Sequence, residues 1–250
     1  MTLFSKVVTG MSAPSDVRQR EFGSTDWSIV RQLDGPDAEQ ALAKLCEQYW
    51  QPLYAYVRSK VRDVHKAQDL TQGFFTQVVA KDSLRQAAPE RGRFRSFVLA
   101  SLKNFMANEY AAENTQRRGG SYRQVSLDFD DGDQYFSRAA VESMTPERVF
   151  DRVWTLTLLD RVADRLRIEH EEAGEAARFE MLKTTLTSAG RGSKYDEIAE
   201  KLQVTEAAAR QAASRLRKRY RELLRLEVGR TLADNDDIDD EIRQMFASLG

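Results

Sequence analysis

The sequence predicts an all-α protein of two small helical domains, and three observations support this fold class. Apolar residues recur at intervals of three and four over most of the chain, which is the spacing of a buried helix face. The only alternating apolar run, Val125, Leu127 and Phe129, is too isolated to support a sheet. Between the helical segments, residues 119–149 combine paired glycines with clustered aspartates and break both patterns. We therefore expect an acidic linker between two helical domains.

The first domain is expected over residues 37–118, after an N-terminal extension over residues 1–36. Its helical stripes are formed by Leu42, Leu45, Tyr49, Leu53 and Val57, by Leu70, Phe74 and Val78, and by Phe94, Phe97, Leu102 and Phe105. Pro52 lies within the first stripe and predicts a kink or break there, because proline lacks the amide hydrogen that a helix interior uses. At helical spacing, the three phenylalanines of the last stripe are better explained as core than as surfaces for base stacking.

The second domain is expected over residues 150–228 and ends in a helix-turn-helix. Its first stripe is formed by Trp154, Leu158, Val162 and Leu166. The hydroxyl of Ser193, three residues before Asp196, predicts the start of a short helix. Residues 202–204 then provide a tight connection, and Thr205 is a good N-cap for a second helix.

That second helix has two distinct faces at 100° per residue. The predicted packing face is formed by Ala209, Ala213, Leu216, Tyr220 and Leu223. The opposite polar face is formed by Arg210, Gln211, Ser214, Arg217, Lys218, Arg221 and Arg225. Arg and Lys can contact phosphates, and Arg and Gln can read base edges. A solvated, arginine-rich helix would explain the same charge, but the short preceding helix, the turn and the small residues at 207–209 favour DNA binding.

The charge of the chain is distributed in opposed blocks. The 250 residues carry a formal net charge of −1, yet the net charge is +5 over residues 81–123 and +4 over residues 191–228. Residues 124–149 and residues 229–250 each carry −4. The near-zero total is therefore a cancellation between segments suited to different partners, and it does not argue against nucleic acid.

Several functional classes find no support in the sequence. The single cysteine, Cys46, excludes an internal disulfide and a cysteine-based zinc site. His65 and His170 are far apart and no Gly-rich phosphate loop or nucleophile motif is present, so we expect no enzyme, no cofactor and no metal site. No apolar run is long enough for a signal peptide or a membrane span, so we expect a cytoplasmic protein without membrane insertion.

Six short motifs follow one another along the chain: Tyr49-Trp50-Gln51-Pro52-Leu53-Tyr54, Gln68-Asp69-Leu70-Thr71-Gln72-Gly73-Phe74-Phe75, Arg93-Phe94-Arg95-Ser96-Phe97, Lys103-Asn104, Asn108-Glu109 and Tyr195-Asp196-Glu197-Ile198-Ala199. This series resembles the sigma factors of bacterial RNA polymerase, in the extracytoplasmic-function (ECF) group of the sigma-70 family. Their order and spacing are fairly specific, although no single motif is decisive, and the resemblance covers residues 40–118 and 150–227. It implies a protein that binds core RNA polymerase and directs promoter recognition, DNA melting and transcription initiation.

The resemblance also implies three sets of contact residues. Asp69 and Gln72 would contact the largest subunit of the polymerase. The start-proximal promoter element would be bound by Arg93, Arg95, Lys103, Asn104, Asn108, Arg117 and Arg118. The upstream element would be bound by Thr205, Arg210, Gln211, Ser214, Arg217, Lys218 and Arg221. The chemistry is suitable, because cations contact backbone phosphates and amides contact base edges.

The chain departs from the family pattern in the helix that binds polymerase. That helix usually opens with several carboxylates, whereas Lys66-Ala67-Gln68-Asp69 retains one. Phosphorylation of Thr71 by a Ser/Thr kinase would add a charge of about −1.5 to −2 and restore the acidity. The alternative is that Thr71 is an ordinary polar residue of the helix, and we prefer this second interpretation.

The acidic segments have open interpretations. In the family, the linker threads through polymerase channels, where Asp128, Asp130, Asp131 and Asp133 could mimic phosphates; a solvated loop explains the same composition. The extension over residues 229–250 places an acidic run before a short amphipathic helix containing Met245. That helix could dock on the protein's own basic helix and block DNA, serve a partner such as an anti-sigma factor, or belong to a disordered tail.

Two other functions are consistent with a helical DNA-binding chain. One is a helix-turn-helix transcriptional regulator that acts without core polymerase, although such a protein would not need the basic, aromatic-rich block over residues 81–123. The other is a helical regulator of sigma factors. Initiation that depends on added core polymerase distinguishes a sigma factor from both.

Overall fold

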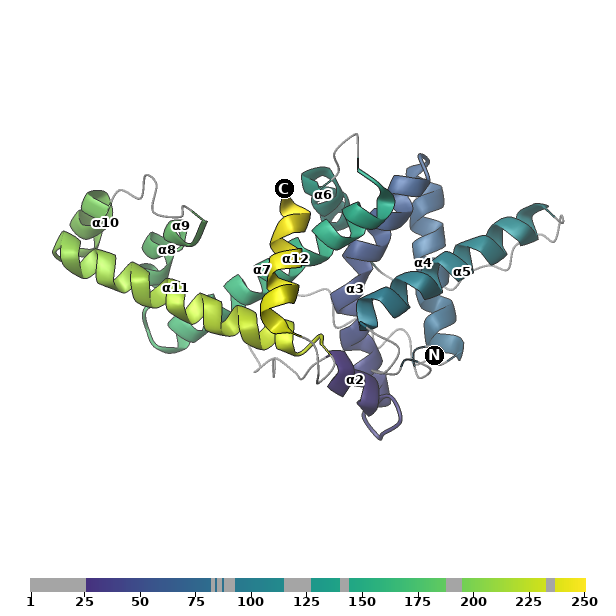
Figure 1. Cartoon of the computed structure of the whole chain (residues 1–250), viewed down its shortest axis with the longest axis horizontal. Coiled ribbons are helices and arrows are strands. Elements are labelled where there is room, and N and C mark those ends of the chain that lie inside the picture. Colours follow the sequence, from purple (N-terminus) through teal and green to yellow (C-terminus); the bar gives the residue numbers. More distant parts are fainter. Residues whose placement is uncertain are drawn as a thin grey trace. The chain divides into compact units, whose positions relative to one another are not determined.

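The computed structural model describes residues 26–81, 84, 87, 93–114, 127–139, 144–187, 195–232 and 237–250. Every regular element among these residues is helical, which confirms the predicted all-α class (Figure 1). The chain divides into two compact units, one of residues 1–157 and 229–250 and the other of residues 158–228. No described helix has the length and apolar character needed to cross a bilayer. The predicted site residues Arg117 and Arg118 lie outside the described residues.

The first unit is organised around one long helix, α3 (Ala38–Lys60), which packs against α2, α4, α5 and α6 (Figure 1). Its other helices are α2 (Asp26–Gln32), α4 (Val64–Lys81), α5 (Phe94–Asn114), α6 (Phe129–Ala139), the start of α7 (Pro146–Glu172) and α12 (Ile238–Leu249). The boundary between the units falls inside α7, after Thr157.

Of the kink or break predicted at Pro52, the break does not occur. Helix α3 runs without interruption from Ala38 to Lys60, with Pro52 in its interior. A proline inside a helix costs about 3 kcal/mol, because one backbone hydrogen bond is lost. Leu53 and Tyr54, which follow it, are both 0% exposed, so the packing of this helix into the core offsets that cost.

The predicted aromatic core is confirmed around Phe94, which is 0% exposed. Its ring contacts Tyr49 edge-on with 5.4 Å between centroids and Trp27 with 5.7 Å. Phe105 is also buried and lies 5.8 Å from the ring of Phe74. Trp27 belongs to α2, which lies in the segment predicted as an N-terminal extension outside the first domain. That prediction is wrong for α2, because its apolar side chains complete the core of the first unit.

The interpretation of residues 119–149 as a linker without regular structure is wrong for Phe129–Ala139, which form α6. Gly132 does not break this helix but allows it to approach α3 closely. A Cβ atom on Gly132 would lie 2.8 Å from Cδ1 of Tyr54 and 2.9 Å from Cζ3 of Trp50. Phe129 packs on the same side, with 5.0 Å between its ring centroid and that of Tyr54. A glycine that resembles a breaker in sequence is here a packing residue.

The second unit contains the end of α7, α8 (Ala176–Leu182), α9 (Thr184–Thr187), α10 (Tyr195–Leu202) and most of α11 (Glu206–Gly229). Leu158, Val162 and Leu166 of α7 are each 0% exposed, as their spacing predicted. Two ion pairs join α7 to α11. Arg219 donates to both carboxylate oxygens of Glu169 at 2.7 and 2.8 Å, and Arg165 donates to Glu227 at 3.0 Å.

Candidate nucleic-acid interface

A tight turn joins α10 to α11. Gln203 adopts a left-handed conformation with φ of 53°, and the amide of Val204 donates to the carbonyl of Ala199 at 3.0 Å, which closes the end of α10. The hydroxyl oxygen of Thr205 accepts a hydrogen bond from the amide of Ala208 at 3.2 Å. The predicted N-cap at Thr205 is therefore confirmed, and it fixes where the next helix begins.

The packing face of α11 is as predicted. Ala209, Ala213, Leu216 and Leu223 are buried. Tyr220 is half-buried, and burial raises the pKa of its hydroxyl to about 12. Because this stripe faces the core of the second unit, the opposite side of α11 faces solvent.

Five of the seven residues predicted to bind the upstream element are exposed side chains of α11: Arg210, Gln211, Ser214, Lys218 and Arg221. The other two are Thr205, which is exposed in the turn, and Arg217, which is half-buried. Within the described part of the chain, Gln211, Ser214, Lys218 and Arg221 make no side-chain hydrogen bond or ion pair. These four groups are available to an incoming ligand.

Tyr195 orients two arginines of this face. The guanidinium of Arg210 lies 4.8 Å from the centroid of the Tyr195 ring, and it also pairs with Glu206. Arg217 donates to the hydroxyl of Tyr195 at 3.1 Å. Since Tyr195 opens α10, it links the start of that helix to the polar face of α11.

Three residues predicted to bind the start-proximal element lie exposed on α5: Lys103, Asn104 and Asn108. Lys103 pairs with Glu147 at 2.8 Å, and this hydrogen bond lowers the pKa of the Glu147 carboxyl. Both partners are more than 40% exposed, so the pair is weak and its ammonium can exchange to another anion. Tyr110 is also exposed, with the ammonium of Lys66 5.2 Å from its ring centroid.

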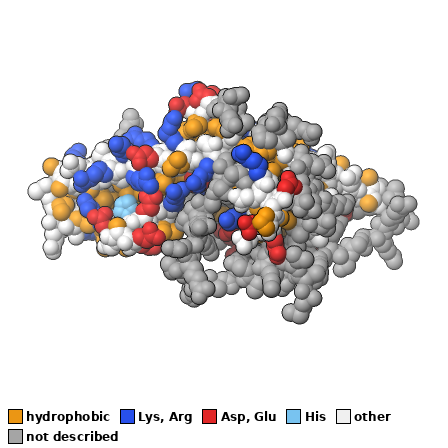
Figure 2. Space-filling model, turned by 90° about the horizontal axis from the view of Figure 1, so that it is seen from below, with side chains coloured by type: hydrophobic (Ala, Val, Ile, Leu, Met, Phe, Trp, Pro, Cys, Tyr) orange, Lys and Arg blue, Asp and Glu red, His pale blue; other side chains and the backbone are white. Residues whose placement is uncertain are grey.

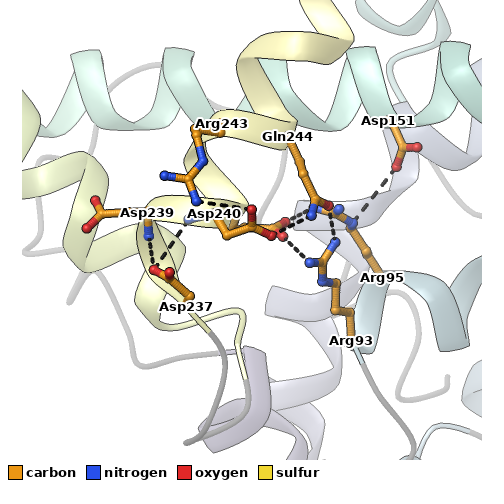
Figure 3. A network of polar contacts seen from close by, with 9 residues as sticks. Arg93, Arg95, Asp151, Asp237, Asp239, Asp240, Arg243 and Gln244 are labelled. Carbon is orange, nitrogen blue, oxygen red and sulfur yellow. Dashed lines mark hydrogen bonds and ion pairs between the residues drawn. The ribbon is translucent and has the colours of Figure 1, made fainter.

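Two other predicted residues, Arg93 and Arg95, are already occupied by the C-terminal helix (Figure 3). The carboxylate of Glu241 accepts from Nη1 of Arg95 and lies 2.8 Å from Nη2 of Arg93. Arg93 also donates to Oε1 of Gln244 at 2.9 Å. Sequence reasoning did not find Glu241 as a partner, because six acidic residues of this extension look alike in sequence.

The side of Arg95 away from Glu241 is held by α7. Its guanidinium lies 4.4 Å from the centroid of the Trp154 ring, and Nε lies 3.9 Å from Asp151. Burial raises the pKa of Asp151, and the nearby arginines partly oppose that shift. Arg95 is 12% exposed, so it contacts no external phosphate while α12 stays in place.

The residues predicted to bind polymerase lie on α4. Asp69 is exposed and Gln72 is half-buried, whereas Leu70, Phe74 and Val78 are in the core as predicted. Thr71 is 0% exposed, and its hydroxyl donates to the carbonyl of Ala67 at 2.8 Å. The phosphorylation hypothesis is therefore wrong for this fold, because Thr71 shares the buried face of α4 and a kinase could not reach its hydroxyl.

The aspartates predicted to lie in the linker divide into two groups. Asp131 accepts from Gln51 at 3.2 Å, and Asp133 accepts from the Tyr54 hydroxyl at 3.0 Å and from Arg58 at 3.2 Å. Burial, together with Asp133, raises the pKa of Tyr54 to about 12. Asp128 and Asp130 are exposed, and Oδ1 of Asp128 accepts from the amide of Asp131. A solvated loop is therefore wrong for the two bonded aspartates, which hold α6 on α3.

A groove of about 510 Å³ lies in the second unit between α7, α8 and α11. Side chains of both charge signs line this groove, among them Glu169, Arg178, Arg215 and Arg219. On the face drawn in Figure 2, Lys and Arg side chains lie among Asp and Glu side chains over the coloured residues.

Comparisons with protein-family models, with curated proteins and with solved structures gave no significant match.

Proposed function

We propose that this protein is an ECF-type sigma factor that binds core RNA polymerase and directs promoter recognition, DNA melting and initiation. The observation that carries the proposal is the exposed polar face of α11, which follows α10 and a tight turn as in a DNA-binding helix-turn-helix. The order of sigma-like motifs in the sequence supports the polymerase-binding and melting functions, which the proposal assigns to α4 and α5.

Each part of the chain has a role in this proposal. Lys218 and Arg221 neutralise phosphates of the upstream element, and Gln211 contacts base edges in the major groove. Lys103 supplies a phosphate contact beside the start-proximal element, while Asn104 and the neighbouring amide of Asn108 contact unpaired bases. All of these side chains are exposed, as direct contacts with DNA require.

The proposal is tested by transcription in vitro with core RNA polymerase and a pool of promoter fragments. We expect initiation only when both the protein and core polymerase are present, and weak promoter binding by the protein alone. Tight, specific binding without polymerase would instead indicate a helix-turn-helix regulator. Inhibition of initiation by a known sigma factor, without initiation of its own, would indicate a sigma regulator.

A pair of matched variants tests the α11 face. Lys218→Ala combined with Arg221→Ala removes two exposed cations and should reduce the salt dependence of duplex binding, with a change in slope of about 1.8 for two phosphate contacts. Arg178→Ala combined with Lys183→Ala removes the same charge from the same unit, at residues whose ion pairs within the described part of the chain are with Glu175 and Glu180. An equal loss in both double variants would show that charge alone, rather than this face, drives binding.

A further inference from the structure

The most buried residue of α12 is a carboxylate. Of the twelve residues of this helix, only Glu241 and Met245 are buried, and Glu241 is 1% exposed. Phe246, the largest apolar side chain of the helix, is 49% exposed. A helix recruited to complete a core would bury its apolar side chains first. The docking of α12 on the first unit therefore depends strongly on the charge of the Glu241 carboxylate.

The charge of Glu241 is matched by two cations. One carboxylate oxygen hydrogen-bonds Arg95 and the other lies 2.8 Å from Nη2 of Arg93, so the carboxylate bridges both guanidinium groups (Figure 3). A DNA phosphate offers arginine the same chemistry, with a negative charge shared by oxygen acceptors. Arg93 and Arg95 are also the arginines that the sequence resemblance places against the start-proximal promoter element.

Further contacts fix the position of α12. Asp237 caps the helix by accepting from the amide of Asp239 at 2.8 Å, and the hydroxyl of Ser248 lies 3.1 Å from that of Thr155. Gln244 accepts from Arg93 at 2.9 Å. These contacts are polar and mostly near the surface, where water or a ligand can replace them at modest cost.

We propose that α12 is a built-in competitor of DNA, in which Glu241 occupies the phosphate-binding position of Arg93 and Arg95. With α12 docked, the carboxylate of Glu241 holds both guanidinium groups, and the side chains of Arg95 and Arg93 are 12% and 29% exposed. When α12 leaves, the two cations become a phosphate-binding surface at the start of α5. This inference rests on the proposed function, because it takes the α5 surface to be a DNA contact.

The test compares two full-length variants that carry the same charge. Glu241→Gln keeps the size of the side chain but removes the charge that bridges the arginines. Asp240→Asn removes one charge from the neighbouring position, where the carboxylate accepts, among the described residues, from Arg243 and Gln244 of α12 itself and from neither arginine of α5. A difference between the two variants therefore reports the bridge to the arginines rather than the net charge of the protein.

The probe is a fluorescein-labelled, 20-nucleotide single-stranded DNA, titrated at several salt concentrations and followed by fluorescence anisotropy. We expect Glu241→Gln to bind at least about tenfold more tightly than wild type at low salt, a gain of about 1.4 kcal/mol. Two new phosphate contacts should steepen the slope of log K against log salt by about 1.4. Asp240→Asn should remain close to wild type in both quantities.

Hydrogen exchange of residues 237–250 gives a second readout. The proposal predicts faster amide exchange in α12 for Glu241→Gln, and also for wild type once the DNA is added. Faster exchange in Glu241→Gln without tighter binding would overturn the proposal and show α12 to be a purely structural helix. Unchanged exchange and unchanged affinity would overturn it as well.

The outcome for the proposed function is separate. Competition between α12 and DNA together with no initiation on added core polymerase would refute the sigma-factor proposal and leave the competitor inference standing. Initiation on added core polymerase, with no difference between the Glu241 and Asp240 variants, would support the sigma-factor proposal and refute the competitor inference.

Discussion

Replacement of Gly132 by alanine tests whether α6 is held on α3 by close packing. The new Cβ would lie 2.8 Å from Tyr54 and 2.9 Å from Trp50, and these side chains are 0% and 3% exposed, so neither ring can move aside freely. Alanine favours a helix over glycine by about 0.8–1.0 kcal/mol. Overpacking a core costs about 1–3 kcal/mol. Because the new methyl group would clash with two rigid rings at once, we expect an overpacking cost in the upper part of that range. After subtraction of the gain in helix propensity, the net destabilisation is about 1–2 kcal/mol.

Urea denaturation followed by tryptophan fluorescence measures this loss, since Trp50 lies at the contact. The midpoint should fall in Gly132→Ala, whereas Gln134→Ala, at an exposed position of the same helix, should stay within about 0.5 kcal/mol of wild type. If α6 detaches locally instead, proteolysis within residues 127–139 should increase before the midpoint moves. A Gly132→Ala protein that is as stable and as protease-resistant as wild type would refute the packing argument.

Further predictions concern the core and the pH dependence of stability. Phe94→Ala should lower the free energy of unfolding by about 3–5 kcal/mol in urea denaturation, because the ring is fully buried. Thr71→Glu should lower the melting temperature sharply by burying an unpaired carboxylate, at a cost of about 3–5 kcal/mol, whereas Thr71→Val should melt close to wild type. Burial raises the pKa of Tyr54 to about 12, so the folded state keeps a proton that the unfolded chain releases, and the free energy of unfolding should fall as pH rises from 10 toward 12. The hydrogen bond from Arg219 lowers the pKa of Glu169 below its ordinary value of 4.5, so stability should decline as pH falls below that value, and Glu169→Gln should flatten the acid limb of a stability profile.

The predicted elements that the structure confirms depend on short-range signals. The stripe from Trp154 to Leu166 and the two faces of α11 follow from a spacing of three and four residues, which any helix imposes locally. The cap at Thr205 likewise needs only the three residues that follow it. The same local reasoning failed at Pro52 and Gly132, where packing against distant rings or core side chains outweighs an unfavourable local preference.

In the candidate site, too, the sequence predicts the features that depend on local spacing but not the contacts between distant residues. Exposure of Lys218 and Arg221 could be read from helical periodicity, because their position relative to Ala213 and Leu216 places them on the far side of the helix. No periodicity relates Arg95 to Glu241, which are 146 residues apart in the chain. In sequence, Arg95 is one cation of a basic block and Glu241 is one carboxylate of an acidic run.

Helix positions, caps and the alternation of basic and acidic blocks are thus properties of the chain itself, because they arise from neighbours within one or two turns. Which carboxylate meets which arginine depends on how the helices pack, since Coulomb attraction selects a partner only after the core has brought the groups together. That packing buries Thr71, binds Asp131 and Asp133 to α3, and places Glu241 between Arg93 and Arg95. The acidic segments that looked like solvated linkers in sequence are, in these places, partners of the protein's own polar groups.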